Sequence, residues 1–398
     1  MKIVLASQFP IYWIQKKMGK KSKIFGHPTG WVVNLANALS QIKNVDLNIV
    51  TLNPQINKSK IIKLNNIIFY LIKNGVPFLH KGFPNYFPLD VLLRFHFDIK
   101  AIIKVIKIIN PDIVHAFGTE GPYSLAGYNS GYPCLISLQG IINKIFKFEP
   151  SLRFLLIRRT EKLAIMNNKY FSCRTKFDRN FILSINKNAN IFDIPEAMNE
   201  VYFENSWEVK NINRIIFVGS LIKRKGIETL IKAIPLVKKK IPDLVLYIIG
   251  NGNSKYKQYL ISLCNKFDIY NNVKFLGYKQ PKEIVEYLIK SQIFVFPSEI
   301  ENSPNVIAEA MVLGLPVLAT KVGGIPYIIE SGKSGILVEK ENSQILSEKI
   351  IYLLRNPSIR MTIGENAKQI ARNLHHPKDV AIKTISAYNE ILECSKNG

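Results

Sequence analysis

The sequence predicts an α/β protein made of two doubly wound domains in tandem. Short apolar runs alternate with helical stretches along most of the chain, which is typical of parallel sheets covered on both faces. The alternation fades once, in a polar stretch near residue 200, and then starts again. The chain has 398 residues, 47% of them apolar, which is enough for two substantial cores.

The first series of elements covers residues 1–200. Its apolar runs predict strands at 2–7, 46–52, 67–72, 112–117, 134–139, 170–174 and 190–194. Its periodic stretches predict helices at 31–42, 90–109, 152–165 and 176–184. The loop after the first strand is long and contains Gly26 and Gly30 just before a helix, so backbone there can approach a ligand closely. This segment lacks the GxGxxG pattern, and it could equally be a flexible turn.

The second series covers residues 214–375, after a linker predicted at 201–213. Strands are expected at 214–219, 244–250, 273–277, 293–296 and 316–320, and helices at 226–239, 254–267, 282–289 and from 304 onward. Near the end of the chain, one apolar stripe at helical spacing carries Ala381, Ile385, Tyr388 and Leu392. This helix should dock on a domain, and we expect residues 376–394 to complete the first one.

Composition limits the classes of function. Four scattered cysteines without a CxxC pair indicate neither a disulfide framework nor a zinc site. The start reads as a core strand and no run is long enough to cross a bilayer, so we expect a cytoplasmic protein. The net charge is +25, and basic residues gather in 14–23 and 151–187. This charge favours a phosphorylated substrate, or attachment to the anionic inner face of the cytoplasmic membrane. Nucleic acid is a less favoured partner, and a lysine-rich compositional bias is the plain alternative.

The stretch 296–330 concentrates the chemistry. The buried strand before Pro297 leads to a helix for which Ser303 is the expected N-cap and Pro304 the first residue. Free N–H groups at such a start suit a phosphate. Glu301 lies before the cap and Glu309 lies within the helix, where both could accept hydrogen bonds from hydroxyls. A nucleotide sugar would supply both groups, although both acids could simply be exposed.

A cationic segment follows the first strand of the second domain. This strand ends in Gly219 and Ser220, and Lys223, Arg224 and Lys225 then precede a helix. Ligands of doubly wound sheets bind at the carboxyl ends of the strands, so these cations could clamp a diphosphate in a cleft between the domains. The alternative is that they are solvent-facing loop residues.

With these residues assembled, the chain resembles the retaining glycosyltransferases of the GT-B fold, family 4, also called the group 1 glycosyltransferases. The second domain carries that family's motifs in order: VGSLIKRKGIETLIKAIPLV, LYIIGNG, VKFLGY, FVFPSEIENSPNVIAEAMVLGLPVLATKVGGIPYII and SGILVE. The first domain is similar more loosely, through Gly26 to Gly30, DIVHAFGTEGP at 112–122 and RTKFD at 174–178.

The resemblance implies a role for each candidate. Glu309 would bind the ribose hydroxyls, Glu301 would hold the donor sugar, and Lys225 with Arg224 would bind the diphosphate. The donor site would also include Ser303, Pro304, Asn305, Val306, Gly219, Ser220, Gly26 and Gly30. The family often has arginine at the position of Ser220 and histidine at that of Phe117. His115 and Glu120 are therefore secondary candidates, and His115 could equally be a buried, satisfied histidine.

The implied activity is transfer of a hexose from a nucleotide diphosphate sugar to an acceptor hydroxyl, with retained anomeric configuration. The acceptor would be a sugar or lipid-linked molecule in cell-surface polysaccharide or glycolipid synthesis, and neither cofactor nor metal is expected. A nucleotide-sugar epimerase with the same fold is the alternative among enzymes. A basic protein that binds nucleic acid or membrane surfaces is the alternative without catalysis.

Overall fold

The computed structural model describes residues 1–17, 30–53, 56–73 and 89–396. The chain divides into two compact units. Unit 1 contains Met1–Ala197 together with Pro377–Gly398, and unit 2 contains Met198–His376. Each unit is described here by itself.

Unit 1 is built on an eight-stranded sheet with the order β3-β4-β2-β1-β5-β6-β7-β8. Its strands are β1 (Lys2–Ala6), β2 (Asp46–Asn53), β3 (Lys60–Leu64), β4 (Ile67–Lys73), β5 (Ile113–Phe117), β6 (Cys134–Ser137), β7 (Tyr170–Cys173) and β8 (Asn190–Asp193). All neighbouring pairs are parallel except β3 with β4. The expected all-parallel alternation is therefore wrong at this edge, where a tight turn joins β3 to β4.

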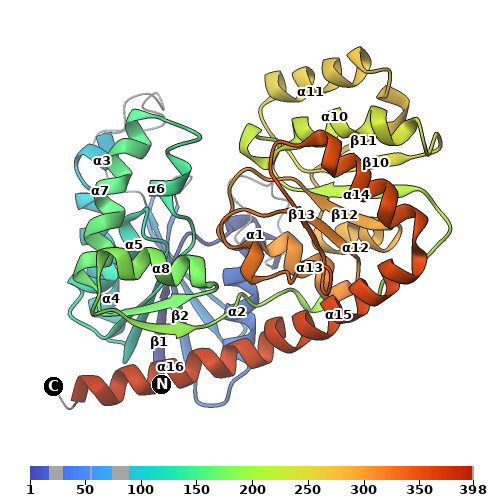
Figure 1. The fold of residues 1–398 in the computed structure, drawn as a ribbon. Coiled ribbons are helices and arrows are strands. Elements are labelled where there is room, and N and C mark those ends of the chain that lie inside the picture. Colours follow the sequence, from blue (N-terminus) through green and yellow to red (C-terminus); the bar gives the residue numbers. More distant parts are fainter. Residues whose placement is uncertain (18–29, 54–55, 74–88, 397–398) are drawn as a thin grey trace. The chain divides into compact units, whose positions relative to one another are not determined.

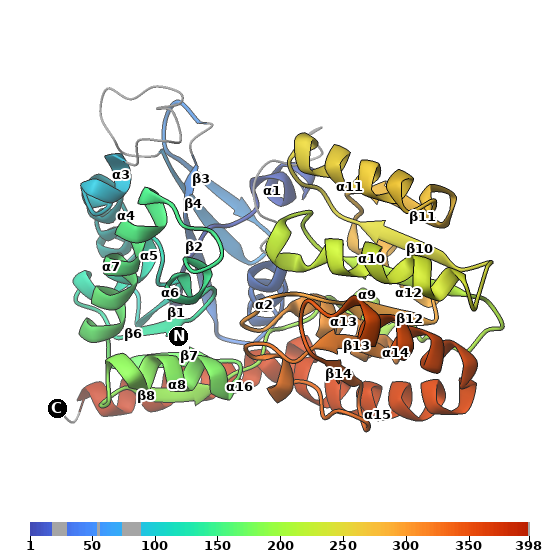
Figure 2. The ribbon, with the colours of Figure 1, turned by 45° about the horizontal axis from the view of Figure 1, so that its top comes forward.

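Helices cover both faces of this sheet (Figure 1). They are α1 (Ile11–Lys17), α2 (Gly30–Ser40), α3 (Leu89–Leu92), α4 (His96–Ile109), α5 (Pro122–Asn129), α6 (Ile142–Ile145), α7 (Leu152–Asn167), α8 (Lys176–Ile185) and α16 (Pro377–Lys396). Because strand side chains alternate, β1 sends Ile3 and Leu5 to the core under α2 and α16, and Val4 and Ala6 to the core under α4 and α5. Figures 1 and 2 show α16 (red) beside α2 (blue), and the two helices are in contact.

The helix expected at 90–109 is interrupted, which corrects the sequence prediction. Arg94 and Phe95 have φ angles of 48° and 54°, in the left-handed region, so the helical path cannot continue through them. Phe95 is 6% exposed and packs with Val91, Ile142 and Ile157 in a small separate core. Burial of this ring accompanies the break between α3 and α4.

Unit 2 is built on a six-stranded, fully parallel sheet with the order β11-β10-β9-β12-β13-β14. Its strands are β9 (Arg214–Val218), β10 (Val245–Ile249), β11 (Val273–Gly277), β12 (Ile293–Phe296), β13 (Val317–Thr320) and β14 (Ile336–Val338). Its helices are α9 (Glu200–Phe203), α10 (Ile227–Lys238), α11 (Ser254–Lys266), α12 (Pro281–Ile289), α13 (Asn305–Leu313), α14 (Ser343–Arg355) and α15 (Pro357–His375). Short 3-10 turns include η1 (Lys223–Lys225). One continuous apolar core joins these elements.

The segment 201–213, expected to be a linker, is packed within unit 2. It begins inside α9, and the backbone N–H of Trp207 donates to Leu313 O at the end of α13 (2.8 Å). The Trp207 indole N–H donates to Ser291 O (2.6 Å), just before β12. These contacts hold the start of unit 2 against the elements that carry the candidate site.

Within the described ranges, no helix is both long enough and apolar enough to cross a membrane.

Candidate functional site

The candidate site in unit 2 is organised by the loop that follows β12. Ser298 is fully buried, and its Oγ lies 2.9 Å from Arg224 O and 2.7 Å from a carboxylate oxygen of Glu301. Thr320, at the end of β13, donates its hydroxyl proton to Ser298 O. Both partners are acceptors, so the single hydroxyl proton of Ser298 is donated either to the Glu301 carboxylate or to Arg224 O, and Ser298 lies between that carboxylate and the backbone of η1.

Lys225 and Glu301 form an ion pair across this loop. Their side chains are 15% and 8% exposed, so water screens the pair less than it screens a surface salt bridge. The Lys225 ammonium also lies 5.1 Å from the centre of the Phe296 ring, at a distance typical of a cation–π contact. Two candidates that are far apart in sequence are thus in direct contact.

Two glycines make this close approach sterically possible. A Cβ on Gly226 would lie 1.8 Å from Pro297 O, and a Cβ on Gly323 would lie 1.7 Å from Glu301 O. Both residues have positive φ angles, 67° and 54°. The neighbouring Gly324 N–H donates to Glu301 O at 3.1 Å. The 323–324 diglycine therefore fixes the backbone of Glu301.

The helix α13 starts one residue later than expected. Pro304 is its N-cap, with φ −75° and ψ 113°, so Ser303 is not the cap and Pro304 is not the first helical residue. The extended ψ angle at Pro304 moves the start of the helix to Asn305. Pro304 makes no side-chain hydrogen bond to this end, so the first-turn N–H groups, including those of Asn305 and Val306, have no cap from the N-cap residue and can meet an anion. The helix ends as expected at Gly314, whose φ is 86°.

Glu309 projects from the middle of α13 and is partly buried. Burial raises the pKa of its carboxyl to about 7, and a hydrogen bond with Tyr202 of α9 opposes that rise. This carboxyl therefore titrates near neutral pH. Sequence reasoning identified Glu309 but missed Tyr202, whose position in a polar stretch gave no signal.

The end of β9 lies beside the end of β10. Gly219 N–H donates to Ile249 O (2.9 Å), and a Cβ on Gly250 would lie 1.8 Å from Gly219 O. The next residue, Ser220, is exposed, and Lys223 is exposed in η1. Arg224 offers its backbone carbonyl both to Ser298 and to the Glu299 N–H (2.8 Å).

The remaining candidates belong to unit 1. Gly30 is the first residue of α2, and Gly26 lies outside the described residues. His115 is buried, with Nδ1 2.6 Å from Tyr388 Oη and Nε2 2.7 Å from Ser137 Oγ. Burial lowers its pKa to about 3, so the ring is neutral at physiological pH. This is the satisfied, buried histidine that the sequence left open as an alternative.

Glu120 lies in the loop between β5 and α5. Its carboxylate folds over Gly118, where an added Cβ would lie 2.8 Å from Oε2. Burial raises the pKa of Glu120, and Oε2 is buried without a hydrogen-bond partner among the described residues. Backbone hydrogen bonds at Thr119 and Glu120 and the charge of Arg174 oppose this rise in the pKa.

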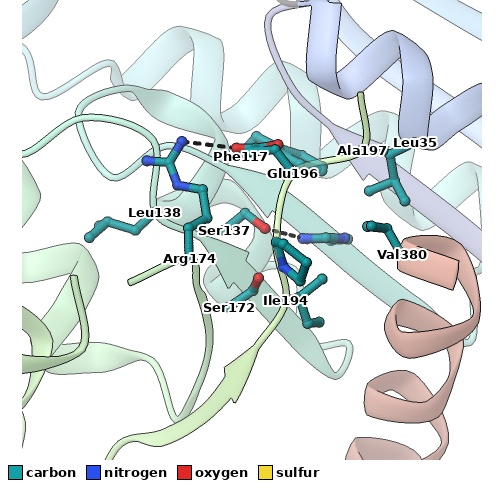
Figure 3. Close-up of a pocket in the computed structure, with 12 residues that line it drawn as sticks. Leu35, Phe117, Ser137, Leu138, Ser172, Arg174, Ile194, Glu196, Ala197 and Val380 are labelled. Carbon is teal, nitrogen blue, oxygen red and sulfur yellow. Dashed lines mark hydrogen bonds and ion pairs between the residues drawn. The ribbon is translucent and has the colours of Figure 1, made fainter. Parts of the chain in front are cut away.

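A small pocket in unit 1 adjoins a charged cluster whose pairing the sequence did not predict (Figure 3). Arg174, directly after β7, donates to Glu196 Oε1 (2.9 Å) and to Gln139 O (2.6 Å). Asp178 lies 3.6 Å from the same guanidinium. Figure 3 shows Arg174 joined to Glu196 on one side of the pocket and Ser137 on another. The Ser137 hydroxyl is the group that contacts His115 Nε2. The RTKFD segment quoted for the resemblance contains two members of this cluster.

The chain is similar in sequence and fold to known glycosyltransferases. Residues 199–370 match the family model for glycosyl transferases group 1. Sucrose-phosphate synthase from Thermosynechococcus elongatus superposes with a TM-score of 0.82 at 17% identity, covering 99% of this chain and 100% of that one. The uncharacterized glycosyltransferase MJ1178 of Methanocaldococcus jannaschii is 26% identical over 88% of this chain and 92% of its own length.

The chain has the GT-B fold, and the match of unit 2 to the group 1 glycosyl transferases, together with the similar glycosyltransferases, indicates a transferase enzyme. Another similar structure is that of Anabaena HepE in complex with UDP-glucose, with a TM-score of 0.72 at 18% identity and full coverage of both chains. The family model falls within unit 2, which contains Lys225, Glu301 and Glu309. These findings favour sugar transfer over the epimerase alternative, and an enzyme over a purely binding protein.

Proposed function

We propose that this glycosyltransferase belongs to family 4 and transfers a sugar, with retention of anomeric configuration, from a nucleotide diphosphate sugar. The observation that carries this proposal is the contact between Lys225 and Glu301 beside the uncapped start of α13. A cation, a buried acid and free helix N–H groups together fit a diphosphate linked to a polyol. HepE, which shares the fold, is described in complex with UDP-glucose.

In this proposal the diphosphate is the leaving group and unit 2 stabilises its developing charge. Lys225 has three N–H donors and directs one of them to Glu301, which leaves others for phosphate oxygens. Arg224 and the first turn of α13 add positive potential. The departing diphosphate would take up the acceptor proton on the same face of the sugar, which gives retention.

The two acids would orient the donor. Glu301 has one carboxylate oxygen facing Lys225 and Ser298, and its remaining acceptor capacity would hold a sugar hydroxyl. Glu309 would accept hydrogen bonds from the ribose hydroxyls. Asn305 and Val306 would face the diphosphate through their backbone, and Ser303, Pro304, Gly219 and Ser220 would form the surrounding wall.

The proposal is tested with a panel of nucleotide sugars and site variants. Removing one transition-state contact typically costs roughly 10²-fold in turnover, so Lys225→Ala and Glu309→Ala should each lose about that much. Lys232→Ala is the matched control, because Lys232 is an exposed lysine of α10, the helix that follows the same turn. Near-normal turnover in both site variants, when folded, would contradict the assignment of Lys225 and Glu309 to the donor site.

The same assay tests the chemistry of the product. We expect a new glycosidic bond with the anomeric configuration of the donor, determined by NMR, and activity that survives a chelator because Lys225, Arg224 and α13 supply the positive charge. An inverted product contradicts family 4. A requirement for added divalent metal contradicts the charge assignment.

The acceptor proposal concerns the exposed face of α7 in unit 1. Leu152 and Leu155 are 52% and 46% exposed, and the helix continues the same face through the exposed Arg159 and Lys162. Apolar and basic side chains on one face suit an anionic membrane surface, where a lipid-linked acceptor for polysaccharide or glycolipid synthesis would be found.

Vesicle sedimentation tests this surface. Anionic vesicles should bind the protein at low salt and bind it less at moderate salt, and Leu152→Ser with Leu155→Ser should weaken the binding. The control is Ile108→Ser, because Ile108 is equally apolar and 68% exposed on α4. Sedimentation that is the same for all three proteins, or absent for the wild type, contradicts the proposal.

A further inference from the structure

Ser298 lies between the two segments that carry the charged candidates of unit 2. Its hydroxyl is 2.7 Å from Glu301 Oε1 and 2.9 Å from Arg224 O in η1, with Ile300 O farther away at 3.2 Å. A carboxylate in an ion pair accepts a hydrogen bond more strongly than a peptide carbonyl does. Since Glu301 is paired with Lys225, the single proton of the Ser298 hydroxyl goes to Glu301.

The backbone of Ser298 is held independently of its side chain. Thr320, which is 1% exposed at the end of β13, donates its hydroxyl proton to Ser298 O. The next residue, Glu299, donates its N–H to Arg224 O at 2.8 Å. Both contacts remain when the Ser298 hydroxyl is removed. The loop after β12 should then stay against η1, and only the contacts of the hydroxyl are lost.

The Glu301 carboxylate is held by one of its two oxygens. Lys225 Nζ and Ser298 Oγ both meet Oε1, and among the residues that the structure describes no hydrogen bond reaches Oε2. The last torsion of a glutamate is soft, and a lysine ammonium sits on a flexible stem, so Lys225 alone would hold the carboxylate loosely. Ser298 adds a second donor from a short, fully buried side chain. Together they fix which oxygen is left for a ligand.

We propose that Ser298 is a positioning residue for the donor sugar: it holds Glu301 through Oε1, so that Oε2 is presented to a sugar hydroxyl. This inference rests on the proposed function, in which Glu301 binds the sugar. It gives Ser298 a part in sugar recognition without a contact to the sugar.

The consequence is a selective loss of sugar binding. In the proposed function a nucleoside diphosphate contacts Lys225 and α13, whereas only the full nucleotide sugar reaches Oε2 of Glu301. The Ser298→Ala variant loses a hydrogen bond to a charged group, so its affinity for the nucleotide sugar should fall roughly tenfold or more. Its affinity for the nucleoside diphosphate should stay at the wild-type value. A general disturbance of the loop would weaken both ligands alike.

The experiment is calorimetric titration of UDP-glucose, UDP-N-acetylglucosamine and GDP-mannose, each beside its own nucleoside diphosphate. The pair that the wild type binds most tightly is then used for the variants. Ser291→Ala is the matched control, because Ser291 is also fully buried and lies two residues before β12, as Ser298 lies two residues after it. The Ser291 hydroxyl donates to Tyr287 O (2.8 Å), away from Glu301. We expect Ser291→Ala to bind both ligands as the wild type does.

A double variant tests whether Ser298 acts through Glu301. The Glu301→Gln variant should lose affinity for the nucleotide sugar in the same selective way. Adding Ser298→Ala to Glu301→Gln should then cost little more, because residues that act through one contact do not have additive effects. Additive losses in the double variant would show that Ser298 acts by another route.

The outcomes separate the inference from the function beneath it. Unchanged affinity for the nucleotide sugar in Ser298→Ala, or an equal loss for both ligands, overturns the role of Ser298 and leaves the donor site in place. A folded wild type that binds none of the probes, or full sugar binding in Glu301→Gln, overturns the donor site itself. Should Ser298→Ala fail to fold, Ser298→Cys is measured with the same expectations, because a thiol has nearly the shape of the hydroxyl and is only a weak donor.

Discussion

His115 shows how a single residue can look functional and serve stability. Its ring lies 4.3 Å from that of Phe117 in a stacked arrangement, and its two nitrogens meet hydroxyls of β6 and α16. The neutral imidazole is therefore part of the core of unit 1. Its pKa of about 3 lies below the usual 6.5, because protonation would place a charge in that core.

This depressed pKa gives a prediction for acid stability. In the unfolded chain His115 takes up a proton as the pH falls through 6.5, whereas in the folded protein it does so only near 3. Its contribution is thus complete above 6.5 and falls below it, by at most about 1.4 kcal/mol per pH unit.

The measurement compares thermal unfolding of the wild type and His115→Gln at several values between pH 7 and 4. The difference in stability between the two proteins should shrink as the pH falls, because glutamine does not titrate. A difference that stays constant across this range would show that His115 is not buried as a neutral ring.

For single residues, the sequence predicts which acids belong to the candidate site, but it does not predict which side chains contact them. Glu301 and Glu309 stand out because they flank a recognisable helix start. Their partners Ser298 and Tyr202 do not stand out, because a serine and a tyrosine have many roles and these contacts depend on packing between distant segments. The pairing of Lys225 with Glu301 was likewise not predicted, although both residues were singled out.

Among elements, the loops that surround the site are constrained by close backbone approach. The turn η1 and the loop after β12 meet at Gly226, and the 323–324 diglycine meets Glu301. Neither contact tolerates a side chain. The apolar runs locate the strands well, but they do not show how the loops after them interlock.

Glycine substitutions can separate the loss of stability caused by steric contact from the loss caused by backbone strain. Gly226→Ala and Gly323→Ala should each destabilise unit 2 by more than the roughly 1 kcal/mol expected for alanine at positive φ, because the new methyl group also meets a carbonyl oxygen. Gly332→Ala is the control, since its φ is 87° and no atom lies within 4 Å of an added Cβ.

Chemical denaturation of the three variants gives the comparison. Equal losses in all three would mean that contact with Pro297 O and Glu301 O costs nothing. A loss of turnover in Gly323→Ala that exceeds its loss of stability would tie the diglycine to the placement of Glu301.

The sequence does not predict helices and strands correctly where tertiary contacts, rather than the local sequence, decide the structure of a short segment. The strand β3 carries exposed lysines and Ile61 at a sheet edge, so its run is too polar to stand out. The break between α3 and α4 has no glycine or proline to mark it. By contrast, β5 and β12 are wholly buried and, apart from His115, apolar, and the sequence predicts both within a residue or so.

For the molecule as a whole, unit 1 is closed by a helix from the far end of the chain. Val380, Ala381, Tyr388 and Ile391 of α16 are buried in the same core as α2 and β1. The apolar stripe in the sequence predicted that this helix docks, but the stripe alone allowed two docking partners. Only packing shows that α16 contributes to the core of unit 1.

Two isoleucines on α16 test this contribution. Ile391→Ala removes a fully buried side chain and should cost about 2–5 kcal/mol, which would lower the unfolding temperature by several degrees. Ile382→Ala removes one that is 53% exposed and should cost far less. The unfolding temperatures of both variants are measured by calorimetry. Similar unfolding temperatures for the two variants would show that α16 is not part of the core.

The return of α16 to unit 1 has a consequence for synthesis on the ribosome. The residues of unit 2 are contiguous, whereas unit 1 needs side chains translated before and after all of them. Unit 2 can complete its core while the last helix is still being made, whereas the part of unit 1 that is translated first must wait with its α2 face uncovered. We therefore expect the order of completion to be the reverse of the order of translation, with the amino-terminal sheet as the part that depends on chaperones in the interval.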